Sequence, residues 1–83
     1  MKVMIADDHA VVRQGIRAVL ESVPGLEVIA EAGTGSEALE LVGTQAPDVL
    51  VLDVNMPGTD GLEVTRALRE EGHDCRILIL SMH

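Results

Sequence analysis

The stretch VLVLDVNMPGTDG at residues 49–61 joins an unbroken apolar run to an aspartate and then to a tight turn. The four apolar residues before Asp53 predict a strand buried on both faces, because a half-exposed strand alternates apolar and polar residues. Pro57 and Gly58 favour a turn, and Asp60 is typical of the residue that begins a helix. Asp53 therefore either caps a structural element or is presented by the strand to a ligand.

Composition narrows the class of protein and its partners. The chain has 83 residues, of which 47% are apolar and none is Phe, Trp or Tyr, so we expect one domain with an aliphatic core. A net charge of −8 and the lack of aromatic stacking residues disfavour direct contact between this segment and nucleic acid. The single cysteine, Cys75, excludes an internal disulfide, and no signal peptide or membrane span is evident. These features predict a cytoplasmic protein without a membrane partner.

Apolar periodicity and capping residues predict strands that alternate with helices. The strands are expected at 3–6, 26–30, 48–53 and 76–81. The helices are expected at 9–23, from the Thr34 cap to just before Pro47, and from the Asp60 cap to near Gly72. This order implies an α/β fold with a parallel sheet and right-handed crossovers. Residues 26–30 are expected at a sheet edge, because Glu27 and Glu31 interrupt them, and the other three strands are expected to be buried on both faces.

Acidic and hydroxyl residues follow three of the predicted strands. Asp7 and Asp8 follow the first, Asp53 ends the third and Ser81 ends the fourth. These side chains meet at the carboxyl rim of the sheet if the first and third strands are neighbours. Carboxylates held together repel one another unless a cation lies among them, and a set of oxygen ligands favours Mg²⁺ over Zn²⁺. Asp53 is the best candidate for a nucleophile that attacks phosphorus and forms an aspartyl phosphate.

These residues resemble a known family. The residues that carry the resemblance are Asp7-Asp8, Asp53, the run Met56-Pro57-Gly58, the pair Asp60-Gly61, and Ser81. The pattern resembles the receiver domain of two-component response regulators. The stretches IADDHAVVRQGI and LILSMH are similar to the LuxR/NarL/FixJ-type subfamily. The resemblance implies a flavodoxin-like (CheY-like) doubly wound sheet of order 2-1-3-4-5, of which this chain would hold 2-1-3-4. The first and third strands would then be adjacent.

The resemblance also implies roles for individual residues. Asp53 corresponds to the phosphoacceptor, and Asp7 and Asp8 correspond to the Mg²⁺-binding acids. Asn55 corresponds to the residue that offers its backbone carbonyl to Mg²⁺, and Ser81 to the hydroxyl that switches position on phosphorylation. The implied partner is a sensor histidine kinase, and the implied output is control of transcription.

The chain departs from the family pattern in its extent. Residues 1–83 are expected to be the N-terminal part of a receiver domain, with the fourth helix, the fifth strand, the fifth helix and the DNA-binding output domain absent. The family's fifth strand carries a lysine that contacts the phosphoryl group, whereas Lys2 is the only lysine here and lies at the other end. The helix at 9–23 would then cover one sheet face nearly alone, and apolar area would be exposed.

Other interpretations remain open. The apolar run 77–80 could pair with a second copy, which gives a non-catalytic module that forms a homodimer or strand-exchanged oligomer. A phosphatase with an aspartyl-phosphate intermediate, as in the haloacid-dehalogenase class, would need an acid two residues after its nucleophile, where Asn55 stands. We therefore expect no enzyme beyond self-catalysed phosphorylation and dephosphorylation. Asp7 and Asp8 could also cap the first helix, and His9 is expected to flank the site without binding metal.

Overall fold

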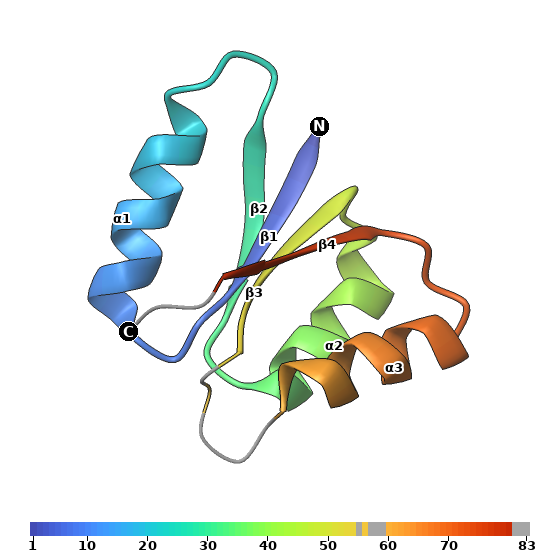
Figure 1. Cartoon of the computed structure of the whole chain (residues 1–83). Helices are drawn as coiled ribbons and strands as arrows, with labels where there is room; N and C mark the ends of the chain where they lie inside the picture. The colour runs from blue at the N-terminus through green and yellow to red at the C-terminus, as the bar shows by residue number, and fades with distance from the viewer. Residues whose placement is uncertain (55, 57–59, 81–83) are drawn as a thin grey trace.

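Strands and helices alternate along the computed structural model, which describes residues 1–54, 56 and 60–80. The elements are β1 (Lys2–Ala6), α1 (Ala10–Glu21), β2 (Glu27–Ala32), α2 (Gly35–Gln45), β3 (Val49–Asp53), α3 (Gly61–Glu70) and β4 (Arg76–Leu80). The strands form one parallel sheet in the order β2-β1-β3-β4 (Figure 1). The predicted α/β class, the strand order and the edge position of β2 are therefore confirmed.

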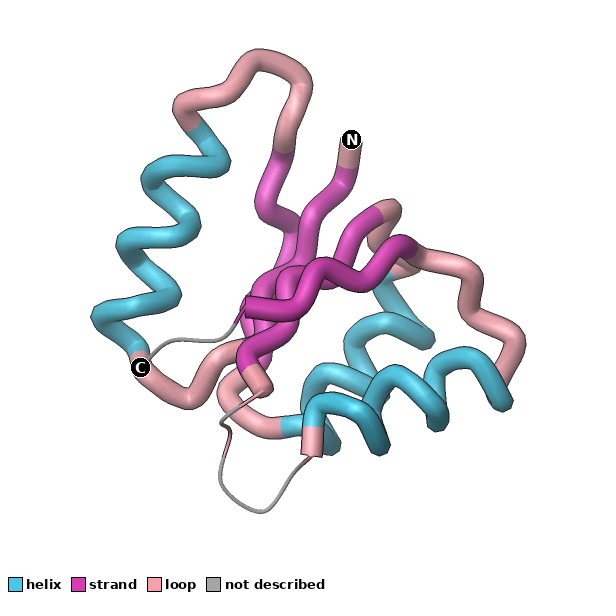
Figure 2. The backbone as a smooth tube through the Cα atoms, viewed as in Figure 1, coloured by secondary structure: helices cyan, strands magenta, loops and turns pink. Residues whose placement is uncertain are grey.

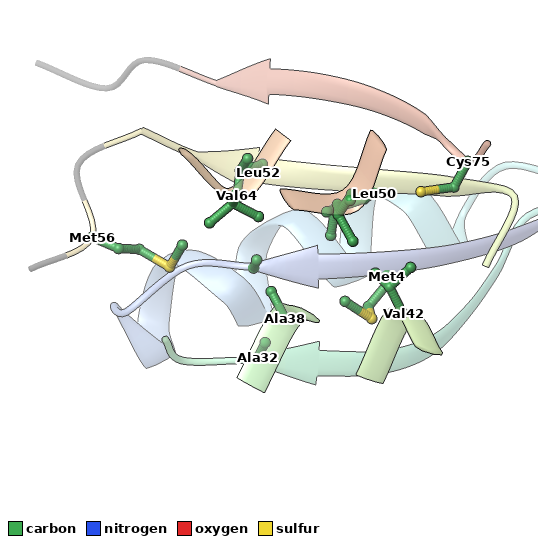
Figure 3. Packing of buried hydrophobic residues seen from close by; sticks show 11 residues of the cluster. Met4, Ala32, Ala38, Val42, Leu50, Leu52, Met56, Val64 and Cys75 are labelled. Carbon is green, nitrogen blue, oxygen red and sulfur yellow. The ribbon is translucent and has the colours of Figure 1, made fainter. Parts of the chain in front are cut away.

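The helices cover the two faces of the sheet unequally. Figures 1 and 2 show α1 on one face and α2 with α3 side by side on the other. The main core lies between the sheet and the α2–α3 layer (Figure 3) and consists of Met4, Ala6, Ala32, Ala38, Val42, Leu50, Leu52, Met56, Val64, Leu68 and Cys75. Burial raises the pKa of the Cys75 thiol, so the cysteine is a neutral core residue just before β4. None of the described helices is long and apolar enough to cross a membrane.

The interior position predicted for the last strand is wrong. Leu78 and Ile79 of β4 are 55% and 42% exposed. Within the part of the chain that the structure describes, β4 pairs only with β3 and forms the end of the sheet. Helix α1 packs on β1 and β2, and its layer does not extend over β4. An apolar run shows that a strand can be buried, but only its neighbours decide whether it is.

The apolar face of α1 is only partly covered. No residue of α1 is buried, and Val19 is 67% exposed. Val12, Ile16 and Leu20, with Gly15 and Val19, line an open groove along the helix. The expectation that this helix stands nearly alone on its sheet face and leaves apolar area exposed is confirmed for the described residues. Its predicted span of 9–23 is longer than the observed Ala10–Glu21.

Two helices begin at the caps that the sequence predicted. The Thr34 side chain accepts a hydrogen bond from the Glu37 N–H at 3.1 Å, and Asp60 Oδ1 accepts one from the Leu62 N–H at 2.9 Å. Each bond satisfies an N–H that has no partner inside the helix. Helix α2 ends when Ala46 adopts a left-handed conformation with φ of 48° ahead of Pro47.

Removing the Thr34 cap tests how much this local signal stabilises the fold. We expect Thr34→Ala to lower the free energy of unfolding by about 1 kcal/mol, because the Glu37 N–H loses its acceptor. Urea denaturation followed by circular dichroism measures the change. Thr44→Ala, an exposed threonine near the end of the same helix, is the matched control and should change stability by less than about 0.5 kcal/mol. Equal effects of the two substitutions would contradict the capping role.

Candidate functional site

The adjacency of β1 and β3 brings their carboxyl ends together. Ala6 of β1 pairs with Leu52 of β3, so the next residues, Asp7 and Asp53, follow in register at the same rim. This rim lies where the strand order reverses, because β1 connects outward to β2 while β3 lies on its other side. Ligands of doubly wound sheets bind at such a switch point. The assumption on which the predicted site depended is confirmed.

The structure gathers three predicted carboxylates and one histidine into a single cluster. Asp7, Asp8, His9 and Asp53 each offer a ligand atom, and these atoms all lie within 4.8 Å of one another. Asp7 is 2% exposed and Asp53 is 5% exposed, so two acidic groups are buried at close range. Such an arrangement favours a bound cation, because ionised carboxylates in a poorly hydrated site repel each other. The predicted site residues Asn55 and Ser81 lie outside the described residues.

Histidine 9 contacts both of the first two acids. Its backbone N–H donates a hydrogen bond to Asp7 Oδ1 at 2.8 Å, and its Nδ1 lies 3.2 Å from the same oxygen. Nδ1 also lies 2.9 Å from Asp8 Oδ1. That oxygen is buried and has no hydrogen-bond partner, since the short approach of the imidazole lacks hydrogen-bonding geometry. The sequence placed His9 beside the site but did not show that its ring nitrogen faces both carboxylates.

The alternative reading of Asp7 and Asp8 as helix caps is wrong. The N-cap of α1 is His9, whose side chain makes no capping bond, and the first turn contains no acidic residue. Asp7 instead accepts the N–H of His9, which turns the chain between β1 and α1. Both carboxylates therefore belong to the cluster at the sheet rim and not to the helix end.

Arginine 13 anchors the loop that carries the two acids. Its Nη1 donates to the backbone carbonyl of Asp7, and its Nε donates to Glu31 Oε1 at 3.2 Å. Glu31 also accepts from Arg17 Nη1 at 2.6 Å, and hydrogen bonds from Arg17 to Glu21 and Glu31 raise the pKa of that guanidinium. The arginine thus ties the β1–α1 loop to the edge strand β2. The sequence analysis missed this contact, although two arginines four residues apart opposite an edge glutamate were a usable signal.

The chain is similar in sequence and fold to known proteins. The family model described as the response regulator receiver domain matches residues 3–83. The nitrate/nitrite response regulator protein NarP of Escherichia coli strain K12 is 47% identical over 81 residues, which cover 98% of this chain and 38% of that protein. A two-component response regulator of the LuxR family from Aurantimonas sp. SI85-9A1 superimposes with a TM-score of 0.93 at 43% identity, covering 99% of this chain and 59% of that one.

A third relative was solved with a phosphate mimic. The isolated REC domain of RcsB from Salmonella enterica serovar Typhimurium, in the presence of phosphomimetic BeF₃⁻, superimposes with a TM-score of 0.91 at 30% identity. The match covers 100% of this chain and 62% of that one. The chain spans 38% of the length of NarP, so it corresponds to only part of such a regulator. The family model, the sequence relatives and the shared fold show that the chain belongs to the response regulator receiver domains of the LuxR/NarL type.

Proposed function

We propose that Asp53 accepts a phosphoryl group from a sensor histidine kinase, with Mg²⁺ bound by Asp7, Asp8 and Asp53 and by the backbone carbonyl of Asn55. The observation that carries the proposal is the convergence of three carboxylates, two of them buried, at the switch point of the sheet. Ser81 is proposed as the hydroxyl that responds to phosphorylation. Family membership supports these roles.

The donor set fits a hard divalent cation. The three acids supply oxygen ligands, which Mg²⁺ prefers, and the buried Asp8 Oδ1 has no hydrogen-bond partner. A bound cation would satisfy that oxygen and reduce the repulsion between the acids. When bound, Mg²⁺ would also neutralise charge on the oxygens of the transferring phosphoryl group.

The chain itself positions the nucleophile. Asp53 ends a strand that is paired on both sides, with β1 and with β4, and Leu50 and Leu52 below it are fully buried. Backbone pairing on two sides restricts where the carboxylate can move, which favours in-line attack. In the proposed step a carboxylate oxygen forms the bond to phosphorus while the bond from phosphorus to the kinase imidazole breaks. That imidazole leaves with the electron pair, and later hydrolysis by water restores the carboxylate. The phosphoryl group would thus come from the kinase, and this chain would be the acceptor.

The relatives support a proposal for the longer protein to which these residues belong. We propose that residues 1–83 are the N-terminal part of a cytoplasmic transcriptional regulator whose DNA contacts come from another domain. A homodimer is supported by family membership and by Leu78 and Ile79 of β4, apolar residues that the described residues leave exposed. The exposed groove on α1 is a second apolar surface that the described chain leaves uncovered.

The proposal is tested by phosphorylating the complete protein in vitro. Incubation with a small phosphodonor and Mg²⁺, followed by intact-protein mass spectrometry, should show the addition of one phosphoryl group that is lost when Mg²⁺ is chelated. No addition, or an addition that does not depend on Mg²⁺, would contradict the proposal.

Arginine 13 should affect the proposed metal site indirectly. We expect Arg13→Ala to weaken Mg²⁺ binding by about tenfold, because the carbonyl of Asp7 loses the donor that holds the loop. Isothermal titration calorimetry measures the affinity. Arg66→Ala removes an exposed arginine of α3 and is the charge-matched control. If both variants weaken Mg²⁺ binding equally, overall charge and not loop anchoring is responsible.

A further inference from the structure

We propose that His9 Nδ1 is itself a metal ligand, so that the acidic site binds an octahedral transition-metal ion such as Ni²⁺ more tightly than Mg²⁺. The inference rests on the metal site of the proposed function and concerns which ion that site selects. It revises the expectation that His9 flanks the site without binding metal. The residues that carry it are Asp7, Asp8 and His9.

The ring nitrogen of His9 lies close to two carboxylates. Nδ1 lies 3.2 Å from Asp7 Oδ1 and 2.9 Å from Asp8 Oδ1, and His9 belongs to the cluster with Asp7, Asp8 and Asp53. Adjacent ligands of an octahedral ion with bonds of about 2.1 Å are separated by about 3.0 Å. The corresponding edge of a tetrahedral zinc site is longer, at about 3.4 Å. The separation of the nitrogen from each of the two oxygens is therefore close to that of neighbouring ligands of an octahedral ion.

The backbone that carries the His9 ring is held in place before any ion binds. The N–H of His9 donates to Asp7 Oδ1 at 2.8 Å, which fixes the backbone from which the ring extends. The His9 side chain is 63% exposed, so an ion can reach Nδ1 from solvent without opening the core. Asp8 Oδ1 needs a partner, and its approach to Nδ1 lacks hydrogen-bonding geometry. An ion between the two atoms would bind both.

The two ions differ in their preference for a nitrogen ligand. Mg²⁺ prefers oxygen ligands and gains little from an imidazole, whereas Ni²⁺ binds imidazole nitrogen well and keeps octahedral coordination. With the three acids and the Asn55 carbonyl of the proposed function, His9 would bring the ligands to five and leave one octahedral position for water or a phosphoryl oxygen. His9 therefore adds affinity for Ni²⁺ but adds little for Mg²⁺, and the site distinguishes the two ions through this residue.

Titrations of the complete protein with Ni²⁺ alone and with Mg²⁺ alone test the inference. We expect His9→Ala to lower the Ni²⁺ affinity by at least about tenfold and to change the Mg²⁺ affinity by much less. His73→Ala is the matched control, because the imidazole of His73 forms one ion-pair contact with a carboxylate among the described residues, at 3.7 Å from Glu71 Oε2. It should leave both affinities unchanged. An unchanged Ni²⁺ affinity in His9→Ala, or an equal loss for both ions, would overturn the inference.

A second measurement needs no substitution. Ni²⁺ is paramagnetic, so titration of the wild-type protein should broaden the NMR signals of the His9 ring before those of His73. Equal broadening of both rings would also overturn the inference. Neither experiment uses a phosphodonor, so failure of phosphoryl transfer would reject the proposed function and leave the role of His9 intact. If His9→Ala leaves the Ni²⁺ affinity unchanged while the wild-type protein is phosphorylated normally, the role of His9 is rejected and the proposed function stands.

Discussion

The substitution Asp53→Asn should abolish phosphoryl addition. Asn has nearly the same shape as Asp, so the end of β3 and its pairing with β1 and β4 should be kept. The neutral amide oxygen is a far weaker nucleophile than a carboxylate, and the site also loses one of its three acids. We expect a complete loss of the added phosphoryl group in intact-protein mass spectra recorded with a small phosphodonor and Mg²⁺.

The same substitution at the other end of β3 is the control. Asp48 precedes the strand, is exposed, and accepts the backbone N–H of Lys2 at 2.7 Å. Asp48→Asn keeps an acceptor there and makes the same change in charge, so phosphorylation should be unaffected. If Asp53→Asn gains a phosphoryl group as the wild type does, Asp53 is not the acceptor. If Asp48→Asn also loses the modification, the loss reflects net charge or folding.

Truncation of Leu50 should produce the largest loss of stability. Leu50 of β3 is fully buried, in the core between the sheet and the α2–α3 layer. Its replacement by alanine removes buried apolar area and leaves a cavity, which lowers the free energy of unfolding by about 3 kcal/mol. Much of α1 and β4 is uncovered, so we expect the variant to lose a large share of a modest total stability. Urea denaturation followed by circular dichroism measures the change.

Leu62 provides a control with identical chemistry. It lies on the outer surface of α3 and is 63% exposed. Leu62→Ala removes little buried area and introduces the residue with the highest helix propensity, so the change should stay within about 0.5 kcal/mol. A similar loss of stability in both variants would show that the cluster around Leu50 is not the main source of stability.

Local patterns in the sequence determined most of the fold. Apolar periodicity, the Thr34 and Asp60 caps and Pro47 predicted the described elements to within a few residues. These signals act over one turn or one strand, so they can be read without knowing what packs against them. That Asp7, Asp8 and Asp53 meet could be predicted only on the assumption that the first and third strands are neighbours, which the family resemblance implied and the sheet order confirmed.

Tertiary structure alone decided the features that depend on neighbours across the fold. The exposure of Leu78 in β4, the contact from Arg13 to the Asp7 carbonyl and the approach of His9 Nδ1 to two acids all depend on packing between distant segments or on side-chain direction. The sequence by itself determined which elements form and which acids end the strands, because those depend on local backbone preference and burial. It could not determine what covers each strand or where a side chain points, because those depend on how the elements pack together.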